Sequence, residues 1–193
     1  MSNAPLIARA AAPWADVIRD IKPDQLGAPT PCADYDVRGL LNHLLYWGPS
    51  LDGAGRKEFT PPPGTPERET DLVGDDWAER LSAHLDRLVA SWSEPDAWQG
   101  MTRMGGSTDW PAATIGGMVL VELVVHGWDL ARAVSQRPAW DDDVTAATYR
   151  ELAGMVEQGR EMGVFGPEIT VPAAASTVDR MLAVSGRDPK WAC

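Results

Sequence analysis

Cysteine is scarce in this sequence, and basic residues are outnumbered. The 193 residues include only Cys32 and Cys193, and they contain no Cys-x-x-Cys pair. Two cysteines, one at the C-terminal end, do not form a disulfide framework, so we expect a protein of the reducing cytoplasm. The 17 Lys and Arg residues face 28 Asp and Glu residues, which gives a formal net charge of -11. Such a surface repels phosphate backbones and anionic lipid headgroups, so neither nucleic acid nor a membrane is an expected partner.

The sequence signals of several common protein classes are also missing. The N-terminal segment has no basic region, and Arg9 and Asp16 interrupt its apolar stretch, so no secretory signal is predicted. The most apolar run, residues 115–125, falls far short of the ~20 residues that span a bilayer and contains Glu122. The His-Glu-x-x-His signature of zinc proteases and the lysine-containing glycine loop of nucleotide enzymes are absent. Peptidase and nucleotide-dependent activities are therefore not expected.

The overall amino-acid composition is typical of a globular protein. Hydrophobic residues make up 44% of the chain and charged residues 23%, so residues 1–193 are expected to fold as a single domain. Tryptophan is unusually frequent among the aromatic residues, with 9 Trp against 2 Phe and 3 Tyr. Large aromatic side chains serve either core packing or the lining of a ligand cavity, and both remain open at this point.

Apolar residues recur at intervals of three and four along most of the chain, which predicts an all-α fold. Pro13 is expected to kink or split the first helix, and Gly48-Pro49 to bend or end the second. The proline-rich residues 53–74 are predicted to be a long connection, and residues 100–106 a loop, with no strand pair in the chain. The expected helices cover residues 5–21, 37–47, 77–92, 111–135 (with Pro111 in its first turn), 142–162 and 176–185.

Glu122 and His126 stand out in the apolar fourth helix. A spacing of four residues places both side chains on one helix face, about 5 to 6 Å apart at Cβ, and Asp129 joins the same face. Burial of an ionised carboxylate costs several kcal/mol unless it is paired, and no Lys or Arg lies between Arg103 and Arg132. Either these three residues form a hydrogen-bonded network, or they contribute to a metal site.

A metal site needs a third ligand, and His43 in the second helix is the candidate. Two histidines and one carboxylate leave coordination positions open for water or substrate. His43 is otherwise a boundary histidine, and His84, at the edge of the apolar side of the third helix, is expected to be partly solvated rather than a ligand. Cys32 is expected to be a small buried hydrophobic residue rather than a nucleophile.

Three segments carry a resemblance to a known family: PTPCADYDVRGLLNHLLYW, VELVVHGWDLARAV and STVDRMLAVSGRDP. They resemble the DinB-like superfamily, in particular the metal-binding domain of mycothiol-dependent maleylpyruvate isomerases and its short single-domain relatives. The resemblance implies a four-helix bundle with a long crossover between the second and third helices, plus short C-terminal helices. It also implies that His43, Glu122 and His126 hold a divalent metal. Asp129 would then orient one of the ligands.

The function implied by the resemblance is that of a mycothiol-dependent thiol transferase or isomerase acting on a small electrophile in a tryptophan-lined pocket. Zinc is the expected ion, with nickel, iron and manganese compatible, and mycothiol is the expected co-substrate. The resembling isomerases carry a second domain that contributes to the active site, for which 193 residues leave no room, so maleylpyruvate isomerisation itself is not expected.

Other interpretations of the sequence stay open. They are a non-catalytic protein that binds metal and a small molecule, a metal-dependent hydrolase, and a structural protein with a buried polar network. Arg132, Arg180 and Arg187 either meet a ligand carboxylate or form surface salt bridges. A homodimer is a further expectation, because dimers are common among the relatives.

Overall fold

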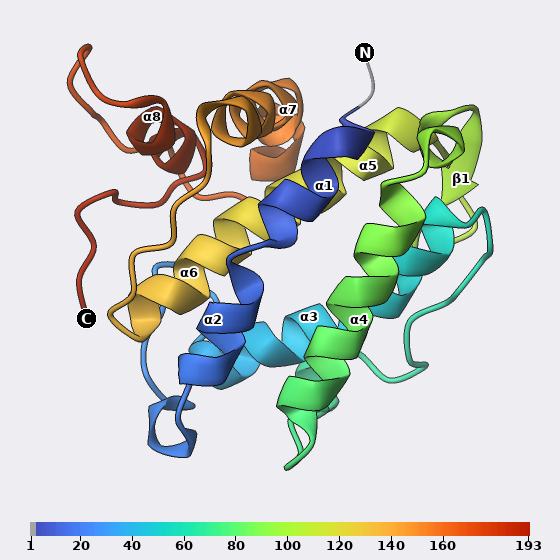
Figure 1. The fold of residues 1–193 in the computed structure, drawn as a ribbon, viewed down its shortest axis with the longest axis horizontal. Helices are drawn as coiled ribbons and strands as arrows, with labels where there is room; N and C mark the ends of the chain where they lie inside the picture. Colours follow the sequence, from blue (N-terminus) through green and yellow to red (C-terminus); the bar gives the residue numbers. More distant parts are fainter. Residues whose placement is uncertain (1–2) are drawn as a thin grey trace.

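The computed structural model describes residues 3–193 and is almost entirely helical (Figure 1). The first predicted helix is split as expected: α1 (Ala4–Ala11) ends before Pro13, and α2 (Trp14–Asp20) begins after it. Proline fixes its own backbone angle and has no N–H to continue the helical ladder, so the chain changes direction there. The two short helices together form one side of the bundle and pack against α4 (Trp77–Trp92).

The second predicted helix is longer than expected, because α3 (Val37–Gly55) continues through Pro49. Of the two expectations for Gly48-Pro49, an end of the helix at this point is wrong. Asp36 caps the helix start, with its carboxylate accepting the Gly39 N–H at 2.7 Å. An internal proline costs a helix about 3 kcal/mol, and burial of the segment after it offsets that cost. The Trp92 indole of α4 donates to the Leu51 carbonyl at 2.8 Å, which ties this second half of α3 to its neighbour.

The long crossover between the second and third bundle helices is confirmed. It leads from the end of α3 to the start of α4 along the edge of the molecule (Figure 1) and contains the short 3-10 helix η2 (Glu67–Glu69). Other 3-10 turns are η1 (Pro23–Gln25) and η3 (Pro95–Trp98). Tyr46 of α3 donates a hydrogen bond to the Thr65 carbonyl at 2.9 Å, which holds the crossover against the bundle.

The predicted loop at residues 100–106 belongs instead to a small antiparallel hairpin, so the expectation of no strand pair is wrong. β1 (Met101–Arg103) pairs with β2 (Asp109–Pro111), with Thr102 opposite Trp110. Three-residue strands are too short to show an alternating pattern in the sequence. Pro111 ends the second strand and precedes α5 (Ala112–Val121), so it lies just outside the first helical turn.

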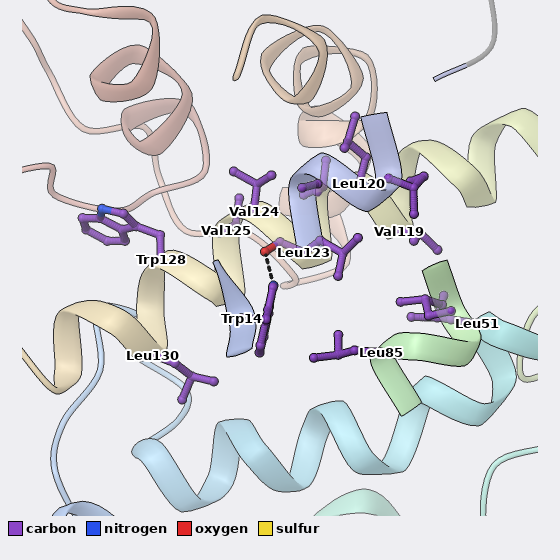
Figure 2. Close-up of a cluster of buried hydrophobic side chains, with 14 of the residues drawn as sticks. Trp14, Leu51, Leu85, Val119, Leu120, Leu123, Val124, Val125, Trp128 and Leu130 are labelled. Atoms are coloured by element: carbon purple, nitrogen blue, oxygen red, sulfur yellow. Dashed lines mark hydrogen bonds between the residues drawn. The ribbon is translucent and has the colours of Figure 1, made fainter. Parts of the chain in front are cut away.

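The fourth helix forms the centre of the molecule. It consists of α5, a π-helical turn η4 (Glu122–His126) and α6 (Gly127–Ala133). Residues Ala112–Ala133 are long and apolar enough to cross a membrane by length and composition alone, but 72% of the most apolar window is buried inside the fold. Figure 2 shows these side chains meeting Trp14, Leu51 and Leu85 from the surrounding helices. This burial identifies the segment as the core helix of the bundle.

Two C-terminal helices extend the bundle from the central one. α7 (Asp142–Glu161) lies against α5, and α8 (Thr177–Val184) lies against α7. The predicted helices at 142–162 and 176–185 are both confirmed, and of the two only α8 is short. Ser176 caps α8 by accepting the Asp179 N–H at 3.1 Å, and Gly186 follows with a φ of +82°. The all-α bundle with its crossover is thus confirmed.

His84 of α4 is buried, which corrects the expectation of a partly solvated side chain. It is only 5% exposed, and its Nδ1 atom has no hydrogen-bond partner within residues 3–193. The imidazole packs directly on Gly48 of α3, where a Cβ atom would lie 2.1 Å from Nε2. Burial disfavours the charged imidazolium, the nearby Arg87 adds repulsion, and together they lower the pKa of His84 to about 4.

This buried histidine is expected to make the protein less stable in mild acid. In the unfolded chain His84 takes up a proton as the pH falls through about 6.5, whereas the folded chain resists until about 4. The unfolded state is therefore favoured progressively between these values, by about 3 kcal/mol at pH 4. Urea unfolding at pH 7, 5.5 and 4 is expected to show this loss in the wild type beyond that of His84→Leu. If the free energy of unfolding falls by the same amount between pH 7 and 4 in both proteins, His84 does not cause the loss.

Candidate metal centre

His43, Glu122 and His126 meet in the interior of the bundle although 79 residues separate the first two. One ligand atom from each of the three side chains can be chosen so that all lie within 4.8 Å of one another. Glu122 Oε2 lies 3.6 Å from His43 Nε2 and 3.5 Å from His126 Nε2. The two imidazole rings stand edge to face, with their centroids 5.3 Å apart. The structure therefore brings together all three residues that the sequence singled out.

The two residues from the central helix lie in its π-helical turn rather than in regular α-helix. The sequence spacing predicted an α-helical pair, and the wider turn of η4 (Glu122–His126) changes that local geometry. The Gly127 amide donates to the Val124 carbonyl instead of bonding four residues back. Such single π turns within α-helices occur frequently at functional sites. Apolar periodicity could not reveal this feature, because a single five-residue turn is too short to show a change of period.

His43 is held from behind by a carboxylate that the sequence analysis missed. Glu67, from η2 in the crossover, places Oε1 3.2 Å from His43 Nδ1. Tyr35 donates its hydroxyl to the same Oε1 at 2.9 Å, and the Trp47 indole donates to Oε2 at 2.8 Å. Glu67 lies in a proline-rich connection without helical periodicity, so no sequence pattern linked it to His43.

His126 is held in the same way by Asp129, the residue expected to orient a ligand. Asp129 Oδ2 lies 3.0 Å from His126 Nδ1, and the Asp129 side chain is fully buried. Arg187, which follows α8, donates from Nη2 to the same oxygen at 3.1 Å. Both histidines thus use Nδ1 for an outer carboxylate, which leaves both Nε2 atoms directed at Glu122.

The structure places the three arginines for which the sequence left a ligand contact or a surface salt bridge open. Arg187 is buried and paired with Asp129, so it is not a surface salt bridge. Arg132 donates to the Trp191 carbonyl at 2.6 Å, and Arg180 lies on the surface of α8. Among these, only Arg187 reaches the site.

The charges of the cluster favour a protonated His43 between two carboxylates. Burial opposes its charged form, but hydrogen bonds with Glu122 and Glu67 outweigh that effect and raise the pKa of His43 to about 9. Burial likewise opposes ionisation of Glu122, yet the nearby His126 and His43 lower its pKa to about 2. The pKa of Glu67 is also lowered to about 2, because hydrogen bonds from His43 and Trp47 overcome its burial. Without another cation, a proton on His43 therefore compensates Glu122.

A cavity of about 230 Å³ opens directly on the three side chains. Its aromatic walls are Tyr35 and Phe165, and no tryptophan lines this cavity. The tryptophans near the cluster, Trp14 and Trp47, line a much smaller cavity of about 20 Å³ that also borders His43 and Glu122. Trp14 and Trp92 are in addition among the most deeply buried side chains of the core. The full lining of the larger cavity consists of Cys32, Asp34, Tyr35, His43, Arg68, Val121, Glu122, Val125, His126, Gly163, Val164, Phe165 and Arg187.

Cys32 borders this cavity but has the properties of a buried thiol. It is 8% exposed, and burial raises the pKa of its thiol, an effect that the positive charge of Arg187 only partly opposes. A nucleophilic cysteine needs the opposite shift, because the thiolate is the reactive form. The expectation that Cys32 is not a nucleophile agrees with this environment.

The donor set fits a divalent transition metal. Two imidazole nitrogens and one carboxylate oxygen converge, and a cavity on their open side leaves room for further ligands. Zinc, iron and nickel sites with this ligand combination keep open positions of that kind. Outer carboxylates on the second ring nitrogen of each histidine are the usual companions of metal-binding imidazoles.

Comparison with known proteins yields one family. The family described as Mycothiol maleylpyruvate isomerase N-terminal domain matches residues 7–131, a range that contains all three clustered side chains. Two relatives from Mycobacterium tuberculosis, uncharacterized proteins of strains CDC 1551 and H37Rv, are each 26% identical over 195 residues. Each match covers 95% of this chain and 97% of the relative.

A solved structure has the same fold. It is the crystal structure of a mutant of the mycothiol-dependent maleylpyruvate isomerase, with a TM-score of 0.60 and 18% sequence identity. The match covers 81% of this chain and 70% of the other. At this identity the likeness establishes the fold, and it agrees with the DinB-like bundle expected from the sequence.

Proposed function

Because this chain belongs to the family of mycothiol maleylpyruvate isomerase N-terminal domains, we propose that it is a metal-dependent enzyme that joins a small-molecule thiol to an electrophile. His43, Glu122 and His126 would hold the divalent metal, with zinc as the expected ion. Mycothiol is the expected thiol, and the reaction is a thiol transfer or a thiol-assisted isomerisation. The convergence of the three side chains on one cavity is the observation that carries this proposal.

The outer carboxylates support the metal assignment over a purely structural polar network. In a purely structural network, one hydrogen-bond partner for each histidine would be enough. Here each histidine has two carboxylate neighbours, an outer one at Nδ1 and Glu122 at Nε2. When a metal ion displaces the proton of His43, an Nδ1–H donated to Glu67 or Asp129 would leave the Nε2 lone pair of each histidine for the metal. Arg187 pairs with Asp129 at 3.1 Å, so the buried carboxylate has a cationic partner.

A bound divalent metal would supply the acidity that converts a thiol to a thiolate near neutral pH. The residues of the chain then have positioning roles. Tyr35 and Trp47 fix Glu67, Glu67 fixes the His43 ring, and Asp129 fixes the His126 ring. None of these groups is itself a reactive nucleophile, so the attacking sulfur comes from the co-substrate.

The cavity favours a small electrophile. Its volume of about 230 Å³ is below the range typical of drug-sized ligand sites, so only part of a large thiol can enter. Val121, Val125 and Phe165 supply apolar walls, and Arg68 supplies a positive charge. A compact molecule with an apolar portion and a negatively charged group matches this lining.

The test is consumption of thiol by the zinc-loaded protein. Mycothiol would be incubated with a panel of small electrophiles, including unsaturated carboxylic acids, and the free thiol measured over time. Thiol loss above the uncatalysed rate in the wild type, and its absence in the Glu122→Ala protein, is the expected result. Metal and mycothiol binding with no turnover on any electrophile would instead identify a non-catalytic binding protein.

A further inference from the structure

The indole of Trp14 reaches from α2 to the turn that carries two of the three clustered residues. Its Nε1 donates to the Leu123 carbonyl at 2.9 Å, the hydrogen bond drawn in Figure 2. Leu123 directly follows Glu122 within the π-helical turn η4. Trp14 is 2% exposed, so this hydrogen bond is made in the interior, where water does not compete for it.

The π turn explains why the Leu123 carbonyl accepts from a side chain. In an α-helix this carbonyl would accept from the amide four residues later, at Gly127. Here the Gly127 amide donates to Val124 instead. A buried carbonyl that loses its helical partner needs another donor, and Trp14 supplies it.

The glycine after His126 makes room for this contact. A Cβ atom on Gly127 would lie 3.1 Å from Trp14 Nε1 and 3.2 Å from Trp14 Cε2. These separations are tighter than ordinary van der Waals contact, so a side chain at this position would displace the indole. The His-Gly-Trp-Asp stretch thus contains a glycine whose packing role is to admit Trp14.

We propose that Trp14 is a positioning residue for the metal centre, and that its indole N–H holds the π-helical turn in the form that directs Glu122 and His126 to one point. This inference rests on the proposed metal binding by those residues. Without the indole donor, the Leu123 carbonyl would be left without a hydrogen bond unless the turn became α-helical and the Gly127 amide donated to it. That change of hydrogen-bond register would rotate Glu122 relative to His126. Metal affinity would fall while the rest of the bundle keeps its fold.

The test compares Trp14→Phe with Trp92→Phe. Trp92 is an internal control: it is also fully buried, and its indole also donates to a backbone carbonyl, that of Leu51, but away from the π turn. Zinc affinity of each folded, metal-free protein would be measured by competition with a chromophoric chelator. Amide exchange of residues 118–130 would be followed in the same proteins by mass spectrometry.

For Trp14→Phe we expect zinc affinity lower by about tenfold or more, the scale known for groups that orient metal ligands, together with faster amide exchange in residues 118–130. For Trp92→Phe, both readouts are expected to match the wild type. Equal changes in the two variants would overturn the role of Trp14 but leave the metal site intact. A wild type that binds no zinc would overturn the proposed function itself, and the positioning role with it.

Gly127→Ala provides a second route if Trp14→Phe does not fold. The added methyl group pushes on the indole without removing it, and the same loss of zinc affinity is expected in smaller measure. Gly154→Ala on α7 is the matched control, because a Cβ atom there meets no atom within 4 Å. Unchanged zinc affinity in Gly127→Ala, with the indole shifted, would count against the proposal.

Discussion

Glu122→Ala is expected to leave the protein without bound metal. The wild type should retain roughly one divalent ion per chain after zinc loading and dialysis, and the variant less than about a tenth of that. Glu122 is the only carboxylate placed between both Nε2 atoms among the described residues, so its loss removes a ligand and the negative charge of the site. Elemental mass spectrometry of both proteins measures this directly. His43→Ala is expected to give the same result.

The surface variant Glu157→Ala serves as control, since that carboxylate on α7 pairs with Arg160 on the same helix and is largely exposed. It should keep the full metal content. Glu67→Gln should retain metal with an affinity lower by about 10- to 100-fold, because it weakens the orientation of His43 without removing a ligand. If Glu122→Ala and wild type carry equal amounts of zinc, the three residues do not form the metal site.

The same assay has an expected pH dependence. The pKa of His43 is raised to about 9 by its two carboxylate partners, so at neutral pH a metal ion must displace a proton from this residue. Affinity should therefore increase as the pH rises toward 9 and decrease as it falls. Zinc loading is best carried out at mildly alkaline pH.

Arg187→Ala is expected to produce the largest loss of stability. The substitution leaves the fully buried Asp129 without its cationic partner, and breaking a buried ion pair from one side costs about 3 to 5 kcal/mol. For a chain of this size the midpoint of thermal unfolding should fall by about 10 °C. Circular dichroism at 222 nm during heating of the metal-free protein measures the change.

Arg19→Ala is the matched control, because Arg19 forms an ion pair with Asp16 on the exposed face of α2. Surface pairs contribute little, so the unfolding midpoint should stay close to that of the wild type. The double variant Asp129→Asn/Arg187→Met should recover part of the stability, since neither charge then remains buried. Equal midpoints for Arg187→Ala and Arg19→Ala would show that the buried Arg187–Asp129 pair does not stabilise the fold.

Helix positions were predictable because each depends on a local pattern. The repeat of apolar residues gave the helices at 77–92 and 142–162 almost to the residue, and Pro13 marked the split of the first helix. Where an element depends on distant contacts the prediction was wrong. Helix α3 continues through Pro49 because α4 packs against its second half, and no local pattern reports that contact.

The residues of the candidate site differ in the same way: those with a local sequence signal were predicted, and those that depend on distant contacts were not. Glu122 and His126 were found because a carboxylate and a histidine at a helical spacing are rare in an apolar run, and His43 because few histidines were available. Glu67 was missed since its partner lies 24 residues away across an irregular connection. The burial of His84 was missed because Gly48, on another helix, makes the space for it.

The sequence by itself determined the helical class, the net negative charge and the three side chains that cluster. Apolar periodicity and residue spacing are local properties, and net charge and the small number of histidines are sums over the chain. Only the tertiary structure decided how those side chains are held. Glu67 of the crossover contacts Nδ1 of His43, Arg187 from beyond α8 pairs with Asp129, and the indole of Trp14 in α2 donates to the π turn. These contacts join segments far apart in the chain, and folding alone brings their atoms within hydrogen-bonding distance.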